Sequence, residues 1–158
     1  MAKYTIKLVW KIKAPLEDVW DAILNTHNWP KWWKNIRQVK ETIRGFDTGT
    51  GSLRYYKLRG ILPYRITFCI MTTNVVQYEI IEGDIYGDIK GNIEWHFSKE
   101  NEFIIVHIIW AVHDTKPLTY IASFFFFYLF KWNFKSIFKR GAKSLTRYLK
   151  APAEIPIL

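Results

Sequence analysis

Cysteine and histidine are scarce in this sequence. The only thiol is Cys69, and the histidines are His27, His96, His107 and His113, with no pair at a spacing typical of zinc ligands. These absences exclude a disulfide scaffold and a site built from several thiolates. The sequence also lacks a nucleophile elbow and a phosphate loop. We therefore expect no metal and no tightly bound nucleotide cofactor, and we assign no catalytic residue.

Long apolar segments are lacking as well. The N-terminal residues Met1–Lys7 contain no uninterrupted apolar stretch, so we expect no signal peptide and a cytoplasmic protein. The longest apolar run, Leu118–Phe130, has 13 residues. A membrane-spanning helix needs about 20 residues, so a run of this length is more typical of a buried or interfacial helix.

Aromatic residues, in contrast, are abundant. They make up 18% of the 158 residues and include eight tryptophans. The length predicts one domain, which we place at 1–150, followed by a C-terminal tail at 151–158. So many rings indicate a large apolar interior, or a cavity with wide flat walls.

The hydrophobic pattern predicts an α+β protein. Residues 4–13 alternate as a half-buried strand, and Leu16, Val19, Trp20 and Ile23 then follow a helical spacing after Pro15. Pro30 begins a second short helix. Strand patterns follow near 37–44, 51–59, 64–73, 75–83, 86–98 and 102–113, with turn signals at Thr73-Asn74 and Gly83-Asp84 among others. A long amphipathic helix extends from Asp114 to about Leu149.

This order of elements and several motifs resemble the START-like superfamily, also called the polyketide cyclase/dehydrase and lipid transport (SRPBCC) group. The motifs are the strand-to-helix entry Ile12–Trp20, the helix Trp29-Pro30-Lys31-Trp32-Trp33, the segment Glu82–Gly91 and the tripeptide Lys131-Trp132-Asn133. The last two resemble an uncharacterised bacterial subset. The resemblance implies a helix-grip fold, in which a curved seven-stranded antiparallel sheet wraps around a long C-terminal helix and encloses a cavity. None of these motifs implies a particular chemistry.

The aromatic residues are the candidate binding site. An apolar ligand between the sheet and the C-terminal helix would contact rings that lie in the apolar phase of the predicted strands and helices, where tyrosine hydroxyls or indole N–H groups could orient it. The candidates are Trp33, Tyr55, Phe68, Tyr78, Trp95, Trp110, Phe124 and Phe127. Both phases of 102–113 are apolar, so the inward assignment of Trp110 stays open at this point.

Three functions compete. The first is binding, with or without transport, of a hydrophobic small molecule or lipid, with no reaction catalysed. The second is a cyclase- or dehydratase-like enzyme acting on an aromatic or polyketide substrate, which an ionisable group facing the cavity would favour. Glu94 and His96 do not supply that group, because the alternation in 86–98 places them on the outer face. The third is a peripheral membrane or RNA binder that uses the basic C-terminal helix; no DNA partner is expected.

The third function rests on charge. Residues 115–153 contain eight cations and no acid, and much of the net charge of +9 comes from this segment. The run 118–130 is apolar on all faces and needs a cover on each. The Trp-rich short helix, a second subunit in a homodimer, or an anionic lipid surface would each supply one.

Overall fold

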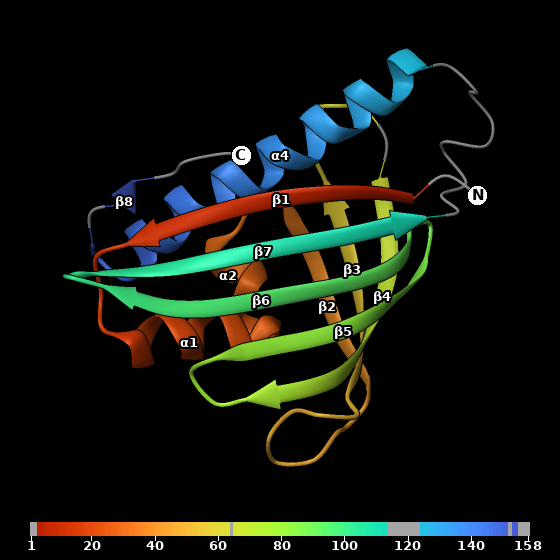
Figure 1. Cartoon of the computed structure of the whole chain (residues 1–158). Coiled ribbons are helices and arrows are strands. Elements are labelled where there is room, and N and C mark those ends of the chain that lie inside the picture. Colours follow the sequence, from red (N-terminus) through yellow and green to blue (C-terminus); the bar gives the residue numbers. More distant parts are fainter. Residues whose placement is uncertain (1–2, 64, 114–123, 152, 155–158) are drawn as a thin grey trace.

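The structure is a computed structural model that describes residues 3–63, 65–113, 124–151 and 153–154, without the side chains of 3, 124–127, 153 and 154. Its main feature is one curved antiparallel sheet with the strand order β2-β3-β4-β5-β6-β7-β1-β8 (Figure 1). The strands are β1 (Lys3–Ile12), β2 (Ile36–Ile43), β3 (Leu53–Arg59), β4 (Arg65–Val76), β5 (Ile80–Gly87), β6 (Lys90–Glu100), β7 (Phe103–His113) and β8 (Ala153–Glu154). Seven strands match the prediction. The two-residue β8 adds an eighth at the edge of β1, within the segment predicted to be a tail.

The helices lie on the inner side of this sheet. They are α1 (Leu16–Leu24), the 3-10 turn η1 (Thr26–Asn28), α2 (Trp29–Trp32) and the long α4 (Phe124–Tyr148). Figure 1 shows α4 running along the sheet beside β1, with α1 and α2 behind the strands. The predicted α+β helix-grip fold, with two short helices after the first strand, is therefore confirmed. The predicted start of the long helix at Asp114 lies outside the described residues.

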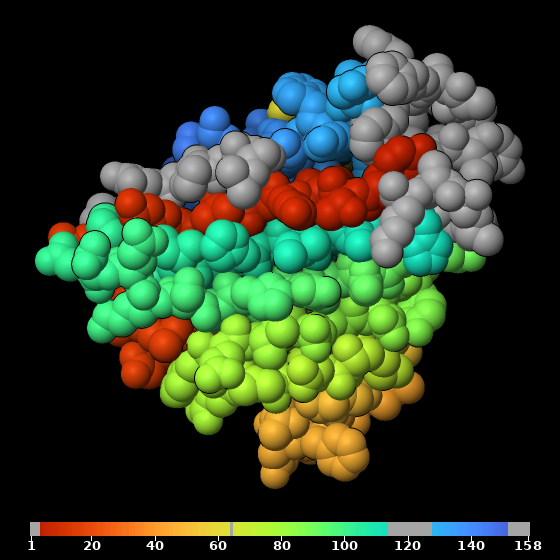
Figure 2. Space-filling view, in the orientation of Figure 1, coloured from red at the N-terminus to blue at the C-terminus, as the bar shows by residue number. Residues whose placement is uncertain are grey.

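Strand alternation builds the core. Ile6, Leu8, Trp10 and Ile12 of β1 are buried as predicted, and on the neighbouring β7 the inward phase is the one that includes Trp110. The indole of Trp10 contacts Trp33, Trp95 and Phe138, with ring centroids 5.7, 5.6 and 6.2 Å away. The other face of the sheet is a continuous surface of β1, β7, β6 and β5 (Figure 2).

One face of α4 closes the core, as the sequence predicts. Phe134, Ile137, Phe138, Ala142 and Leu145 are each at most 2% exposed. The helix approaches the segment after α2 very closely at Gly141, where a Cβ atom would lie 2.4 Å from the Trp33 indole. Only glycine leaves room for that ring. The Trp33 Nε1–H then donates to the Ile137 carbonyl at 3.1 Å, which fixes α4 to the α2 region.

Two hairpin turns lie elsewhere than predicted. Thr73 and Asn74 are not a turn, because β4 continues to Val76 through a register shift and the chain reverses at residues 77–79. Gly83 lies inside β5. A Cβ atom there would lie 2.6 Å from Ile70 Cγ2, so this glycine permits close packing of β5 against β4. Turn residues in a strand often mark such bulges and close approaches.

Candidate functional site

The described residues enclose a small internal cavity between the end of α1 and strands β3 to β6. Its volume is about 40 Å³. Trp29, Trp95, Ile23 and Ile93 give it an apolar wall, and Thr26, Arg54 and Tyr56 lie at a polar end. Pockets for drug-sized ligands usually measure roughly 300–1,000 Å³. A volume of about 40 Å³ has room for only a few water molecules.

The polar end is a connected group of side chains. Arg54 Nη1 donates to the Thr26 hydroxyl at 2.9 Å and to the Leu24 carbonyl at 3.2 Å, and its Nε lies 3.5 Å from Glu41 Oε1. These partners fix the guanidinium at the end of α1. The Tyr56 hydroxyl is hydrogen-bonded to Thr26, and burial raises the pKa of this phenol above its usual value. Tyr56 is therefore neutral at pH 7 and acts as a hydrogen-bonding group.

The structure buries four of the predicted site residues. Trp33, Phe68, Trp95 and Trp110 are each at most 4% exposed. Of these, Trp95 lines the cavity. The other three fill the interior by ring contacts; Trp110, for example, packs edge-on against Phe134 at 4.8 Å and Phe68 at 5.6 Å. Many of the aromatic residues thus pack against one another instead of surrounding an open space.

Two predicted residues occupy other places. Tyr55 is half-buried on the opposite side of β3, and its neighbour Tyr56 is the inward residue, 4% exposed. Tyr78 lies in the turn between β4 and β5 with φ 65°, where its ring packs against Trp20 at 5.8 Å. Its predicted place in a strand was wrong because β4 extends beyond Thr73. The side chains of Phe124 and Phe127 lie outside the described residues.

The prediction missed Trp29, Arg54 and Tyr56. Both phases of β3 mix apolar residues with cations, Arg54 in one phase and Lys57 and Arg59 in the other, so alternation alone does not decide which phase faces inward. In the structure, Arg54 points inward because the end of α1 supplies acceptors and Glu41 supplies a negative charge. Those partners come from distant segments, and no local pattern marks them.

Among the remaining candidates for chemistry, Glu82 lines the cavity and accepts a hydrogen bond from Asn74 Nδ2 at 2.8 Å. The others lie apart from the cavity. His96 Nε2 and Glu94 Oε2 are 2.7 Å apart and partly exposed, and the Asp88 carboxylate accepts hydrogen bonds from the Thr67 amide and hydroxyl. Cys69 is free and half-buried. Within the described part of the chain, no three Asp, Glu, His or Cys residues are placed to hold a metal ion.

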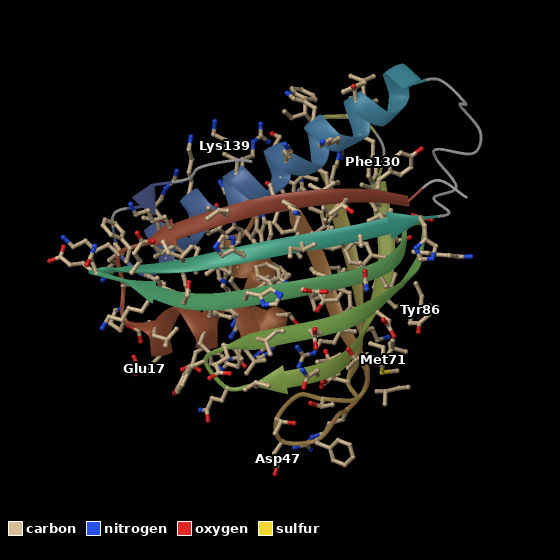
Figure 3. The ribbon with its side chains drawn as sticks, viewed as in Figure 1. Glu17, Asp47, Met71, Tyr86, Phe130 and Lys139 are labelled. Atoms are coloured by element: carbon tan, nitrogen blue, oxygen red, sulfur yellow. The ribbon has the colours of Figure 1, made fainter. Side chains whose placement is uncertain are left out.

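The apolar run 118–130 is only partly visible. Phe130, which belongs to α4, is buried (Figure 3). Tyr128 on the same helix is 54% exposed. Residues 118–127 lie outside the described side chains, so a subunit or lipid contact through the run stays a prediction. No helix in the described ranges combines the length and the apolar character needed to cross a bilayer.

Solved structures with the same architecture cover nearly the whole chain. A START superfamily protein from Mycobacterium smegmatis aligns with a TM-score of 0.73 at 13% identity, covering 92% of this chain and 97% of that one. The Zhui aromatase/cyclase from Streptomyces sp. R1128 aligns at 0.70 and 7% identity, covering 94% of each chain. Ginseng major latex-like protein 151 from Panax ginseng aligns at 0.69 and 10% identity, covering 93% and 97%.

These similarities establish the fold. The chain has the helix-grip architecture shared by START-like, aromatase/cyclase and major latex-like proteins. No protein-family model matches the sequence, and no curated protein matches it either. At identities this low, the activity has to be argued from the residues of this chain.

Proposed function

We propose that the protein binds a small hydrophobic or amphipathic molecule in the interior of the helix grip and does not transform it. The observation that carries this proposal is the composition of the internal cavity, where an apolar wall of Trp29, Trp95 and Ile93 ends at Arg54 and Tyr56. An apolar body would be held by the hydrophobic effect, at roughly 25 cal/mol per Å² buried. A carboxylate, phenol or carbonyl at its end would accept from the guanidinium or the phenol.

Ligand entry requires the cavity to enlarge, and the loop 44–52 between β2 and β3 offers a route. Gly49 of this loop forms part of the cavity wall. An outer hollow of about 230 Å³ lies along the same loop, and Leu24, Gly49 and Arg54 line both spaces. The loop projects from the end of the sheet, with Asp47 near its tip (Figure 3). Outward movement of the loop would join the two hollows beside Arg54.

The test compares a blocked cavity with a matched control. Titration with long-chain fatty acids, quinones and flat polycyclic phenols should quench the tryptophan fluorescence saturably, because Trp29 and Trp95 line the cavity. Ile81→Phe adds bulk to the cavity wall and should weaken binding at least about tenfold, equivalent to about 1.4 kcal/mol. Ile43→Phe makes the same change at a residue that is 49% exposed and should leave binding within about twofold. Absence of saturable binding, or equal affinity in wild type and Ile81→Phe, would refute the proposal.

A cyclase- or dehydratase-like enzyme is the second candidate. It is favoured by Arg54, an ionisable side chain at the cavity, and by the neutral Tyr56 hydroxyl, since two such groups suit polarisation of a substrate carbonyl. Mass spectrometry of a bound ligand before and after long incubation separates the two functions. An unchanged mass supports binding alone, whereas loss of water from a polyketide-type ligand, abolished by Tyr56→Phe, supports the enzyme.

A further inference from the structure

A larger hollow lies on the other side of α4 from the core. It is a groove of about 590 Å³ between the α2 region, the adjoining ends of β2 and β3, and the C-terminal half of α4. Lys31, Lys34 and Arg37 line one wall. Arg140, Lys143 and Arg147 line the α4 wall, and Arg59 lies at the end of β3. We call this surface the basic groove.

No acidic side chain that the structure describes neutralises the cations of the basic groove. All seven are exposed, and no described Asp or Glu lines the groove. The ion pairs in the described part of the chain are Lys13–Glu102, Arg54–Glu41 and His96–Glu94, so none involves a groove cation. Cations gathered in a concave site raise the local positive potential, which a bound anion would relieve.

The walls of the groove are fixed to one another by hydrogen bonds. Trp33 Nε1 donates to the Ile137 carbonyl, which holds the α2 region against α4 (Figure 1). Asn35 Nδ2 donates to the Arg59 carbonyl at 2.9 Å, and the Arg59 amide donates back to the Asn35 carbonyl at 2.9 Å. The backbone that carries the cations is therefore pre-organised, which lowers the entropic cost of binding.

Trp32 adds an unused donor to this surface. It lines the groove and is only 8% exposed, and its Nε1–H is buried without a hydrogen-bond partner among the described residues. Its ring is stacked between Trp33, 5.7 Å away, and Tyr148, 5.9 Å away. A buried donor without a partner is uncommon in native structures and calls for an explanation, such as a ligand or a water.

We propose that the basic groove binds a small ligand or headgroup that carries two or more phosphate groups. Seven cations exceed what a single phosphate would neutralise, and the groove volume lies in the range of small-molecule sites. Single-stranded RNA fits less well, because Tyr148 is the one exposed ring among the lining residues, whereas RNA channels present successive rings for stacking. This site is separate from the internal cavity, so it stands or fails independently of the proposed interior ligand.

The experiment measures binding of three kinds of probe by calorimetry at low salt. Inositol hexakisphosphate and tripolyphosphate represent free polyphosphates, vesicles containing a phosphoinositide represent a lipid headgroup, and oligouridylate represents RNA. Saturable one-to-one binding of either soluble polyphosphate, with affinity that falls as salt rises, is the expected result. Vesicle binding that the soluble polyphosphate displaces would identify a headgroup as the source. Absence of polyphosphate binding, or oligouridylate binding that exceeds it and grows with chain length, would overturn the proposal.

A matched pair of variants locates the site. Arg140→Glu reverses one charge in the groove. Lys139→Glu reverses the exposed charge of the preceding residue of α4, and Lys139 does not line the groove. The two side chains point about 100° apart on the helix, and Lys139 lies on its outer side (Figure 3). We expect Arg140→Glu to weaken polyphosphate binding at least about fivefold, since each cation near an anionic site contributes about fivefold and the new carboxylate adds repulsion. Lys139→Glu should change it less than about twofold; equal losses would mean that net charge alone attracts the anion, and the groove assignment would fail.

Discussion

The internal cavity and the basic groove lie on opposite sides of a single layer of structure, yet they differ in almost every property. The cavity measures about 40 Å³ and is surrounded by rings that pack against one another. The groove measures about 590 Å³, is open and is lined by exposed cations. The helix α4 lines the groove with Arg140 and Arg147 and packs Phe134 and Phe138 into the buried core, whereas none of its residues lines the cavity. The comparison shows that apolar side chains pack closely enough to fill most of the interior, whereas the exposed cations of the groove leave an open space between its walls.

The largest expected effect tests whether the packed interior supplies the stability. Trp10→Ala removes a side chain that contacts three other rings and is 1% exposed, so we expect a loss of about 3–5 kcal/mol in the free energy of unfolding. Trp132→Ala makes the same change on α4 at a residue that is 52% exposed, and should cost less than about 1 kcal/mol. Urea denaturation followed by circular dichroism measures both. Similar losses would mean that the interior is loosely packed, and the contrast with the groove would disappear.

An intermediate effect concerns the polar end of the cavity. Tyr56→Phe removes a hydroxyl that is hydrogen-bonded to Thr26 and should cost about 0.5–1.5 kcal/mol at pH 7. Because burial raises the pKa of Tyr56 in the folded protein, its contribution is fully present below the unfolded pKa of 10.0 and is lost as the pH rises through the folded value.

Wild-type protein should therefore lose more stability than Tyr56→Phe above about pH 10. Absorbance titration of the phenols should show one tyrosine that ionises only as the protein unfolds. If all the tyrosines of the wild type ionise together near pH 10, the hydroxyl is accessible to solvent and the cavity is open.

The smallest expected effect lies in the groove. Lys143 has Lys139 and Arg140 before it and Arg147 after it at the spacings that bring helix side chains together, and all are cations. Lys143→Gln should raise the free energy of unfolding by about 0.3–0.5 kcal/mol at low salt. The gain should vanish in 1 M salt, where the Debye length is about 3 Å. A loss of stability at low salt would show that the cations of α4 do not repel one another.

Local patterns predicted much of the fold, and contacts between distant segments explain the errors. The alternation in 4–13 and the helical spacing near the C-terminus place the buried residues of β1 and α4 correctly, because amphipathic periodicity depends on neighbours in sequence. Two hairpin turns were placed wrongly. Thr73 and Asn74 lie inside β4, which continues to Val76 through a register shift, and Gly83 packs closely against Ile70 across the sheet. Within the site, Trp95 was predicted, whereas Arg54 was not, since its partners lie at the end of α1 and on β2.

By itself, the sequence determined the order of the elements, the apolar face of the C-terminal helix and the excess of rings and cations. Each of these depends on composition or on periodicity along the chain. Only the tertiary structure decided how much space the rings leave and which cations meet. Those outcomes depend on packing between segments, as where Trp33 fits against Gly141 and brings Lys31 and Lys34 opposite Arg140 and Arg147. The sequence therefore predicts the basic face of α4. The groove forms only when the fold places the α2 region opposite that face as a second wall.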